Sequence, residues 1–266
     1  MPVLIGTSRF GSTASFYAKF RSRYPAALLD EIATRCGLGL DGTGRLLDLG
    51  CGPAFIAIAM APHFSEVVGM DPAPEMLEVA AREAAAAHVP VTLIHGSSAD
   101  LGKHLGRFRM AAMGRSFHWM DRDATLVALD ELIEPNGAVA VLGEHHTNAP
   151  ENSFKPIWDA IIKKWAPEAF KAREVRQRPD WESHETILRR SPFSRIERLV
   201  AVSRRETSIE ELIGRSHSQS VSSIAALGEN MDAFERELRE SLLRISPTGK
   251  LKEVVEADAL IAWRAL

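Results

Sequence analysis

A glycine-rich turn between two apolar segments is the most informative stretch of this sequence. Gly50 and Gly52 follow the apolar run 46–49, which contains Asp48, and they precede the apolar run 55–60. Glycine allows a backbone to turn sharply and to approach a ligand closely. The free amides at the start of a following helix favour a polar or anionic ligand group. A strand, a glycine turn and a helix in this order predict a nucleotide-type binding site.

Two further residues indicate which nucleotide is bound. Asp71 ends the predicted strand 66–70 and lies 21 residues after Gly50, close to the spacing at which an acid reaches ribose hydroxyls. The dinucleotide fingerprint has a small residue three positions after its second glycine, whereas this sequence has Phe55 there. Asp48 also suits a cationic ligand group better than a pyrophosphate. An NAD-type oxidoreductase is therefore the least favoured reading.

The block LLDLGCGPA (46–54) resembles motif I of the class I S-adenosylmethionine (SAM) dependent methyltransferases, with Ala54 at the third glycine position. The resemblance implies an α/β fold with a Rossmann-like, seven-stranded, mostly parallel sheet and helical lid insertions. It also implies SAM as cofactor and S-adenosylhomocysteine as product.

Other segments are similar to the parts of this family that surround the cofactor. The run 16–25 resembles an N-terminal lid in which aromatic and Arg side chains cover SAM, and the runs 71–77 and 96–101 resemble the ribose and adenine segments. Ser97 stands where the family usually has an acid, so the side chain that accepts from the adenine amine stays open. The cofactor-binding residues that the resemblance implies are Tyr17, Arg21, Asp48, Gly50, Cys51, Gly52, Asp71, Pro72, Met76, Ser97, Ser98, Ala99, Asp100, Ser116 and Phe117.

Histidines after the fourth and fifth predicted strands are candidate catalytic residues. Methyl transfer depends mainly on alignment of the reactants and exclusion of water, and a hydroxyl nucleophile also benefits from a general base such as His. His118 is the first candidate, and the paired His145 and His146 are the second. Glu144 is a further predicted catalytic residue. The alternative for His118 is that it only orients Trp119.

The likeness to trans-aconitate-type and antibiotic-tailoring methyltransferases implies a small-molecule acceptor that is methylated on oxygen or nitrogen. An amino sugar would find acids in Glu144, Glu151 and Asp121. A tRNA- or rRNA-modifying methyltransferase and a SAM-binding protein without catalysis are the alternatives. The net charge of −3 disfavours the former, whereas the glycine turn does not exclude the latter.

Apolar periodicity divides the chain into a core with insertions. The predicted segments are a helical lid at 1–45, a SAM-binding core at 46–146, a helical insertion at 147–192, an edge strand at 193–206, a helical insertion at 207–252 and a last core strand at 253–266. The strands at 195–202 and 259–264 are expected to form an antiparallel edge. We expect the insertions to cover the acceptor pocket, with Trp158, Trp165, Phe170 and Trp181 packed over it. The polar run 216–220 either faces the substrate or is an exposed connection between helices, and we favour the exposed connection.

Composition and the remaining patterns indicate a globular protein. Of 266 residues, 45% are hydrophobic and 25% are charged, which excludes a disordered chain. Cys36 and Cys51 are the two cysteines, and we expect free thiols in a reducing compartment. The apolar runs are shorter than the ~20 residues of a membrane span, and no signal pattern opens the sequence. We expect a cytoplasmic monomer or homodimer with no bound metal.

Overall fold

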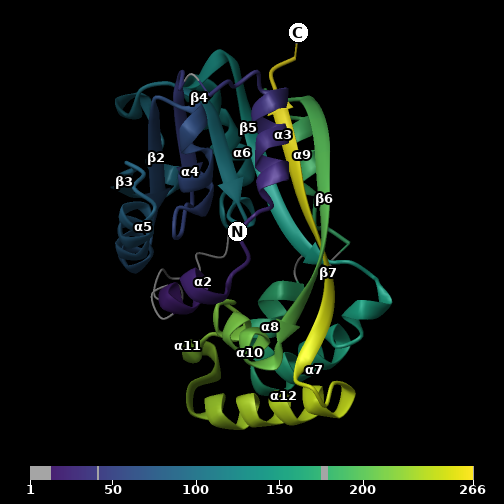
Figure 1. Ribbon diagram of the computed structural model, residues 1–266. Coiled ribbons are helices and arrows are strands. Elements are labelled where there is room, and N and C mark those ends of the chain that lie inside the picture. The colour runs from purple at the N-terminus through teal and green to yellow at the C-terminus, as the bar shows by residue number, and fades with distance from the viewer. Residues whose placement is uncertain (1–12, 41, 175–178, 266) are drawn as a thin grey trace.

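The computed structural model describes residues 13–40, 42–174 and 179–265, and it shows a seven-stranded sheet of order β3-β2-β1-β4-β5-β7-β6 (Figure 1). Strand β7 is antiparallel to both of its neighbours, and the other pairings are parallel. The predicted mostly parallel sheet is therefore confirmed. The strands are β1 Arg45–Leu49, β2 Glu66–Asp71, β3 Thr92–His95, β4 Phe108–Gly114, β5 Ile133–His146, β6 Arg195–Ser208 and β7 Lys250–Trp263.

Helices cover both faces of the sheet and build two apolar cores. Side chains of α3 and α4 pack on one face, and side chains of α6 and α9 pack on the other. The central strand β4 is buried along most of its length, because a parallel strand with helices on both faces needs apolar residues in succession. The helices around the sheet are α3 Ala26–Arg35, α4 Phe55–Met60, α5 Pro74–Ala86, α6 Arg122–Leu132 and α9 His184–Arg189.

A separate helical lobe lies beyond the end of the sheet (Figure 1). Strands β6 and β7 pair continuously from Arg195 with Trp263 to Ser208 with Lys250, and their far half carries the lobe. The lobe has its own apolar core. Its helices are α7 Lys155–Trp165, α8 Pro167–Glu174, α10 Ile209–His217, α11 Ile224–Leu227 and α12 Met231–Ile245.

The two outer strands pair in antiparallel orientation at the edge of the sheet as predicted, but both are longer than predicted. Strand β7 lies between β5 and β6, so the edge strand β6 is parallel to the core and only β7 is antiparallel. Strand β6 continues to Ser208 and β7 already begins at Lys250, which moves the predicted boundaries of the second insertion inward. The run 203–206 is polar, and an edge strand with one exposed face does not need apolar residues there.

Strand β5 is irregular near its start. Phe108 pairs with Ile133 and Met110 pairs with Ala138, so the register shifts between these two pairs. The extra residues of β5, 134–137, form an irregularity in the strand pairing.

The N-terminal helix α2 (Ala14–Phe20) lies between the sheet and the lobe (Figure 1). It packs on α10, where a Cβ added to Gly214 would meet the Phe20 ring at 2.6 Å. The helix ends at Phe20, and Tyr24 lies outside it. Tyr24 is buried in the sheet core and donates a hydrogen bond to the Leu142 carbonyl (3.2 Å). Residues 1–12 of the predicted lid lie outside the described residues.

Candidate functional site

A cavity of about 450 Å³ lies at the carboxyl ends of the central parallel strands, the place where open α/β sheets bind ligands. Helix α2 and the segment that follows α10 close it from the lobe side. The residues that line it are Tyr17, Arg21, Leu49, Gly50, Gly52, Asp71, Pro72, Met76, Ser97, Ser98, Gly114, Arg115, Ser116, Phe117, His118, Trp119, Met120, Val141, Leu142, Gly143, Glu144, His184, Ser218, Gln219, Ser220, Val221, Asp258 and Leu260.

The glycine turn forms one wall of the cavity and requires left-handed backbone at three positions. Gly50, Gly52 and Ala54 have φ values of 69°, 52° and 59°. A Cβ on Gly50 would lie 2.6 Å from the Cβ of Ser116, whose hydroxyl donates to the Leu49 carbonyl (2.7 Å). Gly50 therefore allows the loop after β4 to approach the turn closely. Ala54 takes the third position at the cost of a left-handed L-residue.

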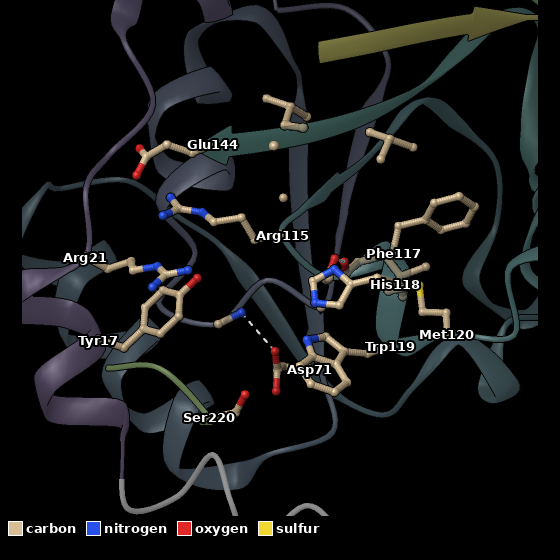
Figure 2. Close-up of a pocket in the computed structure, with 18 of the residues that line it drawn as sticks. Tyr17, Arg21, Asp71, Arg115, Phe117, His118, Trp119, Met120, Glu144 and Ser220 are labelled. Carbon is tan, nitrogen blue, oxygen red and sulfur yellow. Dashed lines mark hydrogen bonds between the residues drawn. The ribbon is translucent and has the colours of Figure 1, made fainter. Parts of the chain in front are cut away.

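Asp71 lies at the mouth of the turn and is fixed by two backbone amides. Gly52 donates to its Oδ2 and Ala73 donates to its Oδ1, both at 2.9 Å (Figure 2). Burial raises the pKa of Asp71 above its usual value, and these two hydrogen bonds partly oppose the shift. Each carboxylate oxygen keeps a further lone pair for a ligand hydroxyl.

Asp48 lies beneath the turn rather than in the cavity lining. Its Oδ2 accepts a hydrogen bond from the Ala57 amide (3.0 Å), so it anchors the first turn of α4. Burial raises the pKa of Asp48 to about 7, the Ala57 amide opposes this, and the nearby Asp71 adds to it. Cys51 is also buried behind the turn, and both cysteines are free thiols. The structure does not bring Asp48 or Cys51 into the cavity.

The predicted adenine segment is only partly in the cavity. Pro72, Met76, Ser97 and Ser98 line it, whereas Ala99 and Asp100 do not. Asp100 accepts from the Ser97 amide (2.8 Å) and from the Ser97 hydroxyl (2.9 Å), which completes the capping box of the short helix Ser98–Asp100. The acid three residues after Ser97 thus shapes the loop and does not face the ligand space.

A group of charged and aromatic side chains lies at one side of the cavity. Figure 2 shows Tyr17, Arg21, Arg115 and Glu144 together there. Burial lowers the pKa of Arg21, and Tyr17 is the largest opposing influence. Glu144 acts electrostatically on both guanidinium groups. Arg115 was not predicted as a site residue, because an apolar strand followed by a polar loop is common to most strand ends.

The opposite side of the cavity is formed by the loop after β4 and by α9. His118 lies in the short helix Phe117–Trp119, with its ring centroid 4.8 Å from that of Trp119 and 6.4 Å from that of His184. Figure 2 shows Phe117, His118 and Trp119 grouped here. His184 was not predicted either, because nothing in the run 147–192 distinguishes it from a surface residue.

The paired histidines after β5 do not line the cavity. His145 is about half exposed, with its Nε2 3.8 Å from Oε1 of Glu256. Nε2 of His146 lies 2.9 Å from Oε2 of the buried Glu253. Of the three candidate bases, the structure therefore places only His118 in the cavity, together with the predicted Glu144.

The polar run 216–220 spans the end of α10 and the segment after it, and it is not exposed, so the favoured exposed connection is wrong. Ser216, His217 and Ser218 are buried, whereas Gln219 and Ser220 are half-buried. Trp158 Nε1 donates to the Ser216 hydroxyl (2.7 Å), and Nε2 of His217 is 2.8 Å from Oε1 of Glu235. These contacts hold the end of α10 inside the lobe, and residues 218–221 line the cavity.

The large aromatics of the first insertion do not line the cavity. Trp158, Trp165 and Phe170 pack in the core of the lobe. Trp181 packs near His184 and under the Arg122 guanidinium, which lies 4.2 Å from its ring centroid. They were expected to pack over the acceptor pocket, and they instead stabilise the elements around it.

The part of the chain that the structure describes offers neither a metal site nor a helix that could span a membrane. No group of three or more His, Cys, Asp or Glu side chains there is arranged to hold a metal ion. Within the same ranges, every helix is too short or too polar to cross a bilayer.

Comparison with known proteins gives matches over the first half of the sheet. A family model described as a methyltransferase domain matches residues 46–137. A ubiquinone biosynthesis O-methyltransferase of Azorhizobium caulinodans is 33% identical over 124 residues, which are 46% of this chain and 49% of the relative. A probable SAM-dependent methyltransferase of Saccharomyces cerevisiae is 25% identical over 131 residues, which are 48% of this chain and 44% of the relative. The chain thus spans about half the length of the curated relatives it matches.

A solved structure matches the fold over nearly the whole chain. The SAM-dependent methyltransferase of Thiobacillus denitrificans in complex with S-adenosylhomocysteine aligns with a TM-score of 0.56 at 16% identity. The alignment covers 96% of this chain and 98% of that one. The sheet and the lobe therefore have a counterpart in a known class I fold.

Proposed function

We propose that this chain, which carries a class I SAM-dependent methyltransferase domain, catalyses methylation of an oxygen or nitrogen atom of a small molecule. The main observation in support is one continuous cavity, which runs from the glycine turn to the loop after β4 and is closed by 218–221. Its volume of about 450 Å³ suits a cofactor with a small acceptor rather than an exposed nucleic-acid surface.

The residues present fit the cofactor. Asp71 retains lone pairs for ribose hydroxyls, and Met76, Ser97 and Ser98 provide a surface for adenine beside it. The buried Nε of Arg21 has no hydrogen-bond partner, which fits a carboxylate at the methionine end. We assign Tyr17 and Arg21 to that end.

The residues of the protein position the reactants, exclude water from them and take up a proton where the acceptor requires it. When bound, SAM supplies an activated methyl group on its sulfonium. The loop after β4 and the segment 218–221 exclude water from the acceptor side. For a hydroxyl acceptor, His118 takes the hydroxyl proton on its imidazole, whereas an amine acceptor in its neutral form needs no such base.

The structure gives little support for an amino-sugar acceptor, because most of the acids expected to bind its amino groups lie outside the cavity. Glu144 lines the cavity, but Glu151 and Asp121 do not. The Asp121 carboxylate accepts from the Ala124 amide (3.1 Å) and caps α6. Two of the three acids expected for amino groups are thus placed elsewhere.

Two measurements test the proposal. Calorimetry with S-adenosylhomocysteine should give binding at micromolar affinity without added metal. Transfer of labelled methyl groups from SAM should then be followed in separate small-molecule, RNA and protein fractions of an extract. Label in the small-molecule fraction supports the proposal. Label in RNA alone favours a nucleic-acid methyltransferase, and binding without any transfer favours a SAM-binding protein without catalysis.

A further inference from the structure

The connection between α2 and α3 is held by side chains rather than by backbone pairing. Within the described ranges, the amides of residues 22–24 donate to no backbone carbonyl. Ser22 is instead held from two sides. Its carbonyl accepts from Nη2 of Arg115 (2.6 Å), and its hydroxyl accepts from Nη2 of Arg205 (2.7 Å). Because Ser22 directly follows Arg21, which lines the cavity, these contacts fix the main chain next to a side chain of the cofactor site.

Arg205 is itself oriented by a buried carboxylate on the neighbouring strand. Glu253 of β7 is buried and accepts from Nε of Arg205 and from Nη1 (2.7 Å) and Nη2 (3.1 Å) of Arg215. Nε2 of His146 lies 2.9 Å from its Oε2. Burial opposes ionisation of Glu253, but the hydrogen bonds with His146 and Arg215 hold the pKa of this carboxyl well below its usual range. The group is therefore charged near neutral pH and keeps Arg205 in place.

The same carboxylate supports the second element that closes the cavity. Arg215 belongs to α10, and its carbonyl accepts from the hydroxyl of Ser218 (2.6 Å), which begins the lining segment 218–221. Glu253 thus supports both the connection after α2 and the end of α10. A buried ion pair adds little to stability compared with apolar residues of similar volume. Its place between the two closing elements points to a role in setting their positions.

We propose that Ser22, held by Arg205, is a positioning residue that sets Arg21 at the methionine end of the cofactor. The inference rests on the proposed function, which assigns Arg21 to that end. Ser22 is not part of the cavity lining, so it acts through its neighbour. The buried Nε of Arg21 has no hydrogen-bond partner in the protein, so that the main chain at 21–22 has a large share in placing this guanidinium. A ligand-binding side chain is effective only when its supporting residues hold it close to the productive geometry.

Two ligands separate positioning of Arg21 from general damage to the protein. S-adenosylhomocysteine carries the methionine end, whereas 5′-methylthioadenosine lacks its amino and carboxylate groups. Ser22→Ala removes the hydroxyl and keeps the carbonyl for Arg115, and Arg205→Met removes the donor and leaves two other partners on Glu253. In calorimetry, each variant should bind S-adenosylhomocysteine about five- to tenfold more weakly, which is less than the loss of a direct hydrogen bond to a charged group. Binding of 5′-methylthioadenosine should stay as in the wild type, because this ligand does not reach Arg21.

Three further variants serve as controls. Ser22→Thr keeps a hydroxyl and should retain most of the affinity for S-adenosylhomocysteine. Arg204→Met changes the preceding, exposed residue of β6 and should bind both ligands as the wild type does. The double variant Ser22→Ala/Arg205→Met should lose no more affinity than either single variant, because both break the same contact.

Three results would overturn the proposal. One is a Ser22→Ala protein with wild-type affinity for S-adenosylhomocysteine, whatever Arg205→Met does. Another is an equal loss of both ligands, which would make the contact only a structural support of the lobe. A third is additive losses in the double variant. Failure of the proposed function is distinct, because it appears in Arg21→Gln: if this variant keeps its affinity for S-adenosylhomocysteine, Arg21 does not bind the methionine end.

Discussion

The cofactor half and the acceptor half of the cavity are built in different ways. On the cofactor side, backbone amides hold the carboxylate of Asp71, and left-handed glycines shape the wall. On the acceptor side, His118 and Trp119 from the loop after β4, His184 of α9 and the segment 218–221 converge. The first half is internally satisfied and preorganised. The second half is assembled from side chains of elements that are far apart in the sequence.

The strongest test of the acceptor half is removal of its candidate base. If the acceptor carries a hydroxyl, His118→Ala should lower kcat by about 10²–10⁴ while S-adenosylhomocysteine affinity stays the same. Steady-state rates and calorimetry measure the two effects. His145→Ala is the matched control, because His145 is outside the cavity lining, and its rate should equal that of the wild type. An unchanged rate in His118→Ala would indicate an amine acceptor or a purely orienting role toward Trp119.

In the cofactor half, the burial of Asp48 beneath the glycine turn should make the stability of the protein depend on pH. Burial raises the pKa of Asp48 to about 7 from an ordinary 3.8. The folded protein therefore holds a proton that the unfolded chain releases, and stability falls as pH rises from about 4 to 7. The loss is at most about 4 kcal/mol. Asp48→Asn should remove this loss, and urea unfolding of the ligand-free protein at pH 5 and pH 8 measures it.

Asp100→Asn is the control for that measurement. Hydrogen bonds from Ser97 lower the pKa of Asp100, so its contribution to stability is lost only as pH falls below its ordinary range. Between pH 5 and pH 8 this variant should keep the pH dependence of the wild type. If Asp48→Asn also kept the pH dependence of the wild type, Asp48 would be ionised in the folded protein at little cost in stability.

A smaller effect is expected when Asp71, at the mouth of the glycine turn, is replaced. Asp71→Asn should weaken S-adenosylhomocysteine binding by about 1.5–3 kcal/mol, the range for hydrogen bonds to a charged group. Calorimetry measures it, and unfolding in denaturant shows whether the loss of the Gly52 and Ala73 bonds has altered the turn. Equal affinities in a stable variant would remove Asp71 from the ribose site.

The same contrast explains what could be predicted from the sequence. The turn around Gly50 and the strand end at Asp71 are local patterns, so the sheet and the cofactor side follow from runs of fewer than about ten residues each. Arg115, His184 and the segment 218–221 are brought together by the tertiary fold. No periodicity marks such residues, because their role depends on distant partners.

The polar run 216–220 shows the limit most clearly. Serines and a histidine between helices are typical of exposed loops, yet Ser216 and His217 are buried in the lobe, where Trp158 and Glu235 provide partners for them.

The smallest expected effect concerns the contact that joins the two halves. Phe20 of α2 packs so closely on Gly214 of α10 that an added Cβ would lie 2.6 Å from its ring. Gly214→Ala should displace α2, and with it Tyr17 and Arg21. We expect S-adenosylhomocysteine affinity to fall by about 1 kcal/mol, the low end of the cost of overpacking, partly offset in stability by the better helix propensity of alanine.

A double-mutant cycle separates displacement of α2 from damage to α10. Phe20→Ala removes the ring that Gly214→Ala would strike, so the double variant should bind S-adenosylhomocysteine as Phe20→Ala alone does. The coupling energy between the two sites should then be favourable and close to the loss seen in Gly214→Ala. Additive losses would mean that alanine at 214 perturbs α10 itself. In that case α2 covers the cofactor without depending on the lobe, and the two halves of the cavity are independent.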